Sequence, residues 1–227
     1  MRYYHYISTS KVDMLFPQLP PDFLAGIKVE LGFDFGLFKG KLAGDRRDDT
    51  ADVARASAIE RYLEKTGALR TEIAEGTWLR GQFKARSGFL PECPGMVLFG
   101  GRIGDVVLLL AGSEDHLVSG QCSQGTSRGW SFFPRSLGAL RRVVETHLPF
   151  SELTSTGDSY DGSVAESFVF GGVGEISGAM FRAFRSLPEE SLPGPPLQQS
   201  FVARIFMVRS NHRGEALAFG SPLFIAE

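Results

Sequence analysis

Alternating apolar and polar side chains predict strands in the middle of the chain. Residues 78–89 alternate apolar with charged positions, as a half-solvated strand does. Residues 96–99 and 106–110 are apolar and flank a glycine-rich turn at 100–105, which predicts a hairpin with a buried second strand. A third strand is predicted at 116–121, so this region is expected to form a β-meander.

Further strands are predicted towards the two ends of the chain. Residues 2–7 are rich in tyrosine and precede a polar run, as a strand ending in a turn does. Residues 201–209 and 216–225 are expected to pair as a hairpin. Residues 179–187 fit either a strand or a helix, because their aromatic side chains suit both periods.

Helices are predicted where apolar residues recur every three to four positions. Asp22 is placed to cap a helix that runs to residue 31, a second helix is expected from Thr50 to a left-handed stop at Gly67, and a third covers 135–148. The other face of the second helix is charged, and its side chains are expected to lie in solvent. They are Asp52, Arg55, Glu60, Arg61, Glu64 and Lys65.

The order of these elements predicts an α+β fold with a largely antiparallel sheet. The meander and the C-terminal hairpin lie on either side of a helical region, and this is not the strand and helix alternation of a doubly wound fold. About three helices are expected to pack on the sheet. The length of 227 residues is compatible with a single domain over 1–227, or with two lobes that meet near 148–165.

Composition and charge remove several classes of function. The 24 basic and 26 acidic side chains leave a net charge of −2, so neither nucleic acid nor an anionic membrane is an expected partner. The longest aliphatic stretch, 106–111, is too short to span a bilayer, and the N-terminus lacks the apolar run of a signal peptide. Only Cys93 and Cys122 are present, which favours a cytoplasmic location over a disulfide framework.

Two glycine clusters invite comparison with phosphate-binding loops. The glycines at 171–178 follow an apolar segment, as in a nucleotide-binding turn, but only 49 residues follow Gly178 and they predict a hairpin instead of parallel units. A plain turn is therefore preferred. The cluster at 100–104 lacks the Lys-Ser/Thr ending of a phosphate loop, and a hairpin turn explains it. Arg102 on that turn is a candidate ligand contact, because hairpin loops carry binding residues.

Candidate acid-base chemistry is concentrated at the end of the most apolar strand. Ser113 and His116 flank two carboxylates there, so both are candidate site residues, although solvated turn residues would give the same string. No G-x-S-x-G pattern supports Ser113 as a nucleophile, and Cys122 departs from the caspase pattern. The four histidines are scattered, and neither a metal nor another cofactor is predicted.

The polar segment after the first predicted strand is the remaining candidate site. Ser8, Ser10 and Lys11 lie where a strand passes into a helix, and hydroxyls with a lysine can hold an anion at such a junction. The simpler interpretation is that Ser10 caps the helix. The sequence is compatible with both interpretations.

The chain resembles an uncharacterised family, a domain of unknown function found in short proteins of streptomycetes and related bacteria. The resemblance is carried by the opening RYYHYIS, by KVDMLFPQLP at 11–20, by FGG at 99–101, by 112–118 and by GSPLFIA at 220–226. It implies a bacterial cytosolic protein and brings no reaction or catalytic residue. A place in a sensing or conflict system is an expectation by association.

Two functions are compatible with these observations. The first is a non-catalytic binding or scaffold protein that recognises a small polar ligand or a protein partner, because no complete catalytic signature is present and glycine-rich loops follow rigid hairpins. The second is an enzyme acting on a nucleotide or other phosphorylated small molecule, which requires Lys11, Arg102 and His116 to meet in one pocket. A homo-oligomer is expected if the β edges are open.

Overall fold

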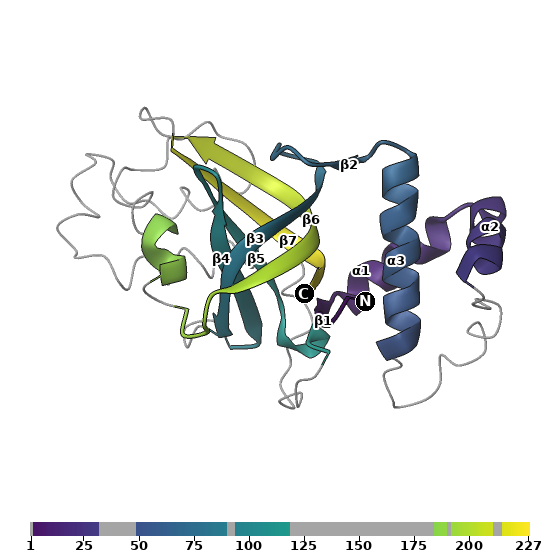
Figure 1. Ribbon diagram of the computed structural model, residues 1–227, viewed down its shortest axis with the longest axis horizontal. Coiled ribbons are helices and arrows are strands. Elements are labelled where there is room, and N and C mark those ends of the chain that lie inside the picture. The colour runs from purple at the N-terminus through teal and green to yellow at the C-terminus, as the bar shows by residue number, and fades with distance from the viewer. Residues whose placement is uncertain (1, 32–48, 90–93, 119–183, 190–191, 211–214) are drawn as a thin grey trace, which may run out of the picture.

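The computed structural model describes residues 2–31, 49–89, 94–118, 184–189, 192–210 and 215–227 (Figure 1). The strands are β1 (Tyr4–Ile7), β2 (Leu69–Arg70), β3 (Trp78–Phe89), β4 (Met96–Ile103), β5 (Val106–Ser113), β6 (Leu197–Ser210) and β7 (Ala216–Ala226). The helices are α1 (Thr9–Leu15), α2 (Pro21–Leu31) and α3 (Asp49–Lys65), with 3-10 turns at Phe16–Gln18 and Glu114–His116 and a helical segment at 184–189.

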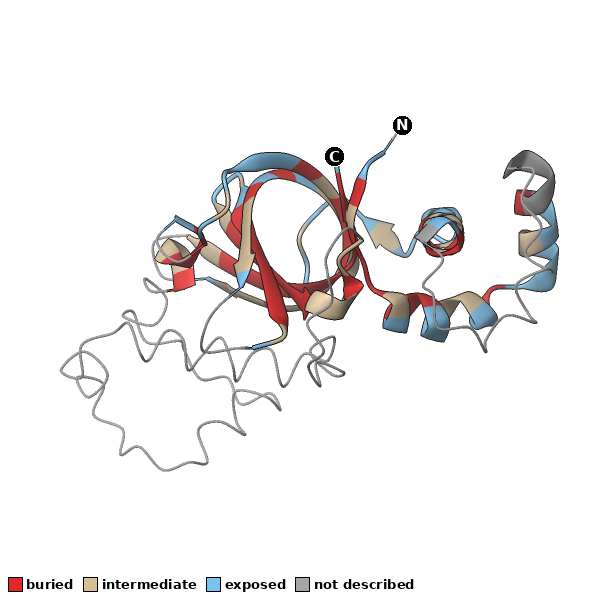
Figure 2. Cartoon of the chain, turned by 90° about the horizontal axis from the view of Figure 1, so that it is seen from below, coloured by how far each residue is buried: buried red, intermediate tan, exposed pale blue. Residues whose placement is uncertain are grey.

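Five strands close into a barrel. The meander β3-β4-β5 is antiparallel, β6 pairs with both β3 and β7, and β7 pairs with β5 in parallel, so each of these five strands has two neighbours within the ring. The ring is visible in Figure 2. This order, a meander followed by a hairpin that closes on the first and third strands, is the Greek-key connectivity of OB-type barrels. A shared fold does not decide function.

Inward side chains fill the barrel, as the alternation in the sequence requires. Phe83 and Phe201 meet edge to face with ring centroids 5.0 Å apart, and Phe99 packs beside Tyr6 at 5.6 Å. Tyr6 reaches this core by crossing close to β5, where a Cβ on Gly112 would lie within van der Waals overlap of the Tyr6 ring. The barrel interior is therefore a packed core and not a channel.

A second core lies between the helices and the outside of the barrel. Ile59 of α3 and Val12 of α1 are buried against Val202 and Phe224, which point outward from β6 and β7. The two ends of the chain pair here, since the amides of Tyr3 and Glu227 each donate to the other residue's carbonyl oxygen at 3.1 and 2.9 Å. α1, α2 and α3 stand together on one side of the barrel, and the helical segment 184–189 lies on the opposite side (Figure 1).

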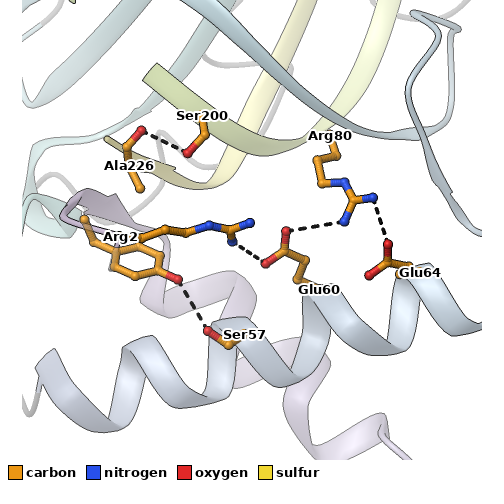
Figure 3. A network of polar contacts seen from close by, with 8 residues as sticks. Arg2, Ser57, Glu60, Glu64, Arg80, Ser200 and Ala226 are labelled. Atoms are coloured by element: carbon orange, nitrogen blue, oxygen red, sulfur yellow. Dashed lines mark hydrogen bonds and ion pairs between the residues drawn. The ribbon is translucent and has the colours of Figure 1, made fainter. Parts of the chain in front are cut away.

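Polar contacts also hold α3 on the barrel (Figure 3). Arg2 Nη1 donates to Glu60 Oε2 at 2.6 Å, and Arg80 of β3 lies 4.0 Å from the other Glu60 oxygen while donating to Glu64 at 2.8 Å. The Glu60 side chain is only 8% exposed. The expectation of a solvated face is therefore wrong for Glu60, which meets Arg2 and Arg80, and for the buried Asp52, which lies 3.5 Å from Arg55. It is confirmed for Arg61, Glu64 and Lys65, which are exposed.

The central glycines lie in a strand, contrary to the predicted turn. Gly100, Gly101 and Arg102 all belong to β4, and the turn is limited to Gly104 and Asp105. A Cβ on Gly101 would come within 2.4 Å of the Lys84 carbonyl oxygen on β3. These glycines therefore permit close approach between strands, whereas the turn itself is made by Gly104 with φ of 56°.

The described strands and helices decide several other predictions. The strand expected at 116–121 is replaced at its start by the 3-10 turn Glu114–His116 and a single bridge from Leu117 to Tyr6. The predicted helices at 22–31 and 50–65 and the terminal hairpin are confirmed, and Gly67 ends α3 with φ of 67°. The helix predicted at 135–148 and the glycine cluster at 171–178 lie outside the described residues.

The α+β class with a mostly antiparallel sheet is confirmed, but the closed barrel and the parallel pairs β5-β7 and β2-β3 were not predicted. Closure leaves only the short β1 and β2 at edges of the described sheet, which removes the open edges on which the expected self-association rested. Within the described ranges, no helix combines the length and the apolar character needed to cross a bilayer.

Candidate functional site

The polar segment at the start of α1 forms a buried hydrogen-bond cluster centred on Lys11. Lys11 Nζ donates to Ser221 Oγ at 2.6 Å, to the Pro222 carbonyl oxygen at 3.1 Å and to Ser8 Oγ at 3.3 Å. Ser8 is the N-cap residue of α1, yet its side chain makes no capping hydrogen bond. The prediction that Ser10 caps the helix is therefore wrong. The lysine instead ties α1 to β7.

Lys11 has no carboxylate within ion-pair distance among the described residues. Burial lowers the pKa of Lys11 to about 7. A lysine with such a pKa beside a serine hydroxyl has the composition of a Ser-Lys catalytic pair. Ser8 and Ser221 are fully buried, however, and neither of the two cavities described below reaches them. This hydrogen-bond cluster therefore joins α1 to β7, and it lies apart from both cavities.

His116 lies beside this hydrogen-bond cluster and joins the turn after β5 to α1. Its Nδ1 is 2.8 Å from Thr9 Oγ1 and its Nε2 is 3.1 Å from Ser10 Oγ. One donating and one accepting nitrogen suffice for these two hydroxyls. Ser113 Oγ accepts a bond from the amide of Asp115 and caps the turn. Both ring nitrogens of His116 are thus engaged by the protein.

Arg102 lies away from the other predicted site residues. Ser113 pairs with Met96 at one end of the β4-β5 hairpin, whereas Arg102 pairs with Val107 near the other end. Six residues of strand separate Met96 from Arg102, a distance of about 20 Å at 3.3 Å per residue. Lys11, Arg102 and His116 therefore do not share a pocket, and the enzyme hypothesis loses the geometry it required.

A cavity of about 540 Å³ opens at the end of the barrel nearest β1. Its floor is formed by Val97 and Phe99, which belong to the barrel core. Ser87 and Gln199 form its walls from β3 and β6, in the same inward register as Phe83 and Phe201. The mouth of a β-barrel is a common position for a small-molecule site.

Two lining residues of this cavity, His5 and Gln199, have a buried polar atom without a hydrogen bond among the described residues. Among these same residues, His5 Nε2 lies 3.1 Å from Glu227 Oε1, whereas Gln199 Oε1 has no such neighbour. The Gln199 side chain is buried, with 3% of the residue exposed. Its Oε1 accepts no hydrogen bond from any described residue. A buried acceptor without a hydrogen bond lowers the stability of the folded protein by about 1–3 kcal/mol. A ligand that donates one hydrogen bond into the cavity recovers that cost.

The rim of the cavity carries exposed apolar side chains and one imidazole. Phe89 and Leu197 are among the most exposed large apolar side chains described, at 52% and 41%. His5 of β1 also lines the cavity, and its Nε2 lies 3.1 Å from Glu227 Oε1. The cavity therefore suits a ligand with an apolar body and a small polar head.

None of the predicted site residues lines this cavity. The hydrogen-bond cluster and the adjoining turn contain five of them: Ser8, Ser10, Lys11, Ser113 and His116. The sixth, Arg102, lines a second cavity on the outside of the barrel. A signal for Gln199 was present in the sequence. It is a polar residue on the inward face of β6, where the next inward positions are apolar: Phe201, Ala203 and Ile205.

The comparisons with known proteins give one match. A family model described as "Family of unknown function (DUF7019)" covers residues 2–227. No curated protein and no solved structure matches the chain. The matched range includes every stretch on which the resemblance in the sequence was based.

Proposed function

The chain belongs to this family of unknown function, and from that premise we propose that it is a non-catalytic binding protein whose open barrel end holds a small ligand. The ligand has a flat apolar body and at least one N–H or O–H donor. The single observation behind the proposal is that Gln199 Oε1, buried at the wall of a 540 Å³ cavity, has no hydrogen-bond partner among the described residues.

The geometry supports binding more than catalysis. The cavity wall contains one carboxamide, one serine hydroxyl and one imidazole beside a carboxylate, on a floor of Val97 and Phe99. Apolar contact supplies most of the affinity in such a site, and a few polar groups set orientation. The exposed Phe89 and Leu197 extend the apolar surface outward, so the ligand is expected to project from the barrel.

The proposal is tested with small aryl amides and lactams, each paired with its N-methylated counterpart, for example benzamide and N,N-dimethylbenzamide. Dissociation constants come from ligand-observed NMR. The N–H compounds are expected to bind about three- to tenfold more tightly, because a hydrogen bond contributes about 0.5–1.5 kcal/mol.

The matched variants are Gln199→Leu and Gln198→Leu. Gln199→Leu is expected to abolish the preference for N–H compounds. Gln198→Leu is expected to keep it, because Gln198 is the next residue on β6 and is exposed on the other face. The proposal is rejected if no N–H compound binds at millimolar concentration, or if Gln199→Leu retains the preference.

The proposal also places the protein in the bacterial cytoplasm. The support is the presence of only two cysteines and the resemblance described above.

Sedimentation velocity of the purified protein measures whether it self-associates.

A further inference from the structure

A second cavity of about 450 Å³ lies on the outside of the barrel and is rich in positive charge. It is bounded by β3, by β4 and by Arg185, Pro188, Glu189 and Pro196. Four basic side chains line it, and Glu189 is the one acidic residue beside them: Lys84, Arg86, Arg102 and Arg185. It shares no lining residue with the cavity that contains Gln199.

The strand register forces two of these cations together. Lys84 of β3 pairs directly with Arg102 of β4, and both are on the outer face. Like charges on directly opposite positions of an antiparallel pair destabilise a sheet. Lys84 has no carboxylate within ion-pair distance among the residues described, so its charge is not offset there.

The other polar groups only partly offset this charge. Arg102 Nε is 3.7 Å from Glu189 Oε1, a pair whose carboxylate side chain is 69% exposed and therefore weakly held. Arg86 Nη1 donates to the Gly194 carbonyl oxygen at 3.0 Å, which keeps the guanidinium at the cavity without cancelling its charge. Arg185 forms an ion pair with Glu215.

The space for a ligand lies over the basic side chains and not directly above Gly100, where the side chains of Leu192 and Pro188 would lie 3.0 Å from an added Cβ. This glycine lines the cavity on the outer face of β4 between the basic side chains. A guanidinium presents parallel N–H donors that match two oxygens of a phosphate, whereas a lysine contributes a point charge. We propose that this cavity binds the phosphate group of a small phosphorylated molecule through Lys84, Arg86 and Arg102.

The test measures binding of phenyl phosphate and inorganic phosphate by calorimetry at constant ionic strength. Lys84→Gln and Arg102→Gln are each expected to weaken binding roughly three- to tenfold. Arg70→Gln is the matched control, because it removes one exposed positive charge on β2, outside the cavity. It is expected to leave the dissociation constant within about twofold.

Glu189→Gln gives a result in the opposite direction. Removing the carboxylate beside Arg102 is expected to tighten phosphate binding, and misfolding cannot produce such a gain. The proposal fails if neither phosphate binds at millimolar concentration, if Arg70→Gln weakens binding as much as Arg102→Gln, or if Glu189→Gln does not tighten it. A short single-stranded oligonucleotide that binds while phenyl phosphate does not would also overturn the assignment to a small molecule.

Discussion

At the scale of single residues, Lys11 couples the stability of the fold to pH. Burial lowers its pKa to about 7 from an ordinary value of 10.5. Between these two values the unfolded chain holds a proton that the native protein has released. The free energy of unfolding is therefore expected to rise with pH across this window, by up to about 1.4 kcal/mol per pH unit. Below pH 7 Lys11 is protonated in both states, so this group is expected to add no pH dependence there.

The Lys11→Met variant isolates this contribution from other titrating groups. Urea unfolding of both proteins at pH 7, 8 and 9 should show a stability difference that grows with pH in favour of the wild type. Methionine keeps the apolar length of the side chain and cannot titrate. Two parallel stability curves would show that Lys11 has the same pKa in the folded and unfolded states.

Single residues also show what the sequence could not establish. Gly100 and Gly101 suggest a turn when only their neighbours are considered, because glycine is the usual turn residue. Their role depends on the Lys84 carbonyl of another strand and on Leu192, which lies 3.0 Å from a Cβ placed on Gly100. Lys11 likewise meets its partners Ser221 and Pro222 across 210 and 211 positions of sequence.

At the scale of elements, the docking of α3 on the barrel depends on Glu60. A hydrogen bond from Arg2 to Glu60 raises the pKa of Arg2, so this contact favours the charged guanidinium. Glu60→Gln keeps the shape of the side chain and removes its charge. It is expected to lower the free energy of unfolding by about 1–2 kcal/mol, because charge-assisted hydrogen bonds are stronger than neutral ones.

Glu64→Gln is the control on the same helix. Glu64 also bonds to Arg80, but its side chain is 54% exposed and solvent screens the pair. Little change in chemical denaturation is expected from this variant. Equal losses for Glu60→Gln and Glu64→Gln would mean that burial of Glu60 adds nothing to the contact.

The elements themselves were largely predictable. Period-two alternation located β3, and apolar runs located β4 and β5, because each side of a strand meets a different environment. Closure was not predictable by this means. It requires β6 to pair with β3 along Leu197–Arg204 and with β7 along Ser200–Ser210, and alternation specifies which face is buried without specifying the neighbouring strand.

At the scale of the whole molecule, the two cores share strands. Phe201 and Ala203 of β6 point into the barrel, whereas Val202 between them packs against the helices. Phe224 and Ile225 of β7 divide in the same way. Neither core can lose its packing without exposing one face of strands that the other core needs. The expectation is a single cooperative unit and not two independent lobes.

Ile59→Ala in α3 tests this cooperativity at a distance. Ile59 is buried to 1% exposure in the helical core and is absent from the barrel core. The truncation is expected to cost about 2–4 kcal/mol by leaving a cavity. In native-state hydrogen exchange, the protected amides of β4, on the barrel, should lose as much free energy of protection as those of α3, because both exchange through the same global opening. Leu108→Ala, inside the barrel, should reciprocally lower protection in α3. If β4 keeps its protection in Ile59→Ala, the barrel is stable without its helices and the chain is two units.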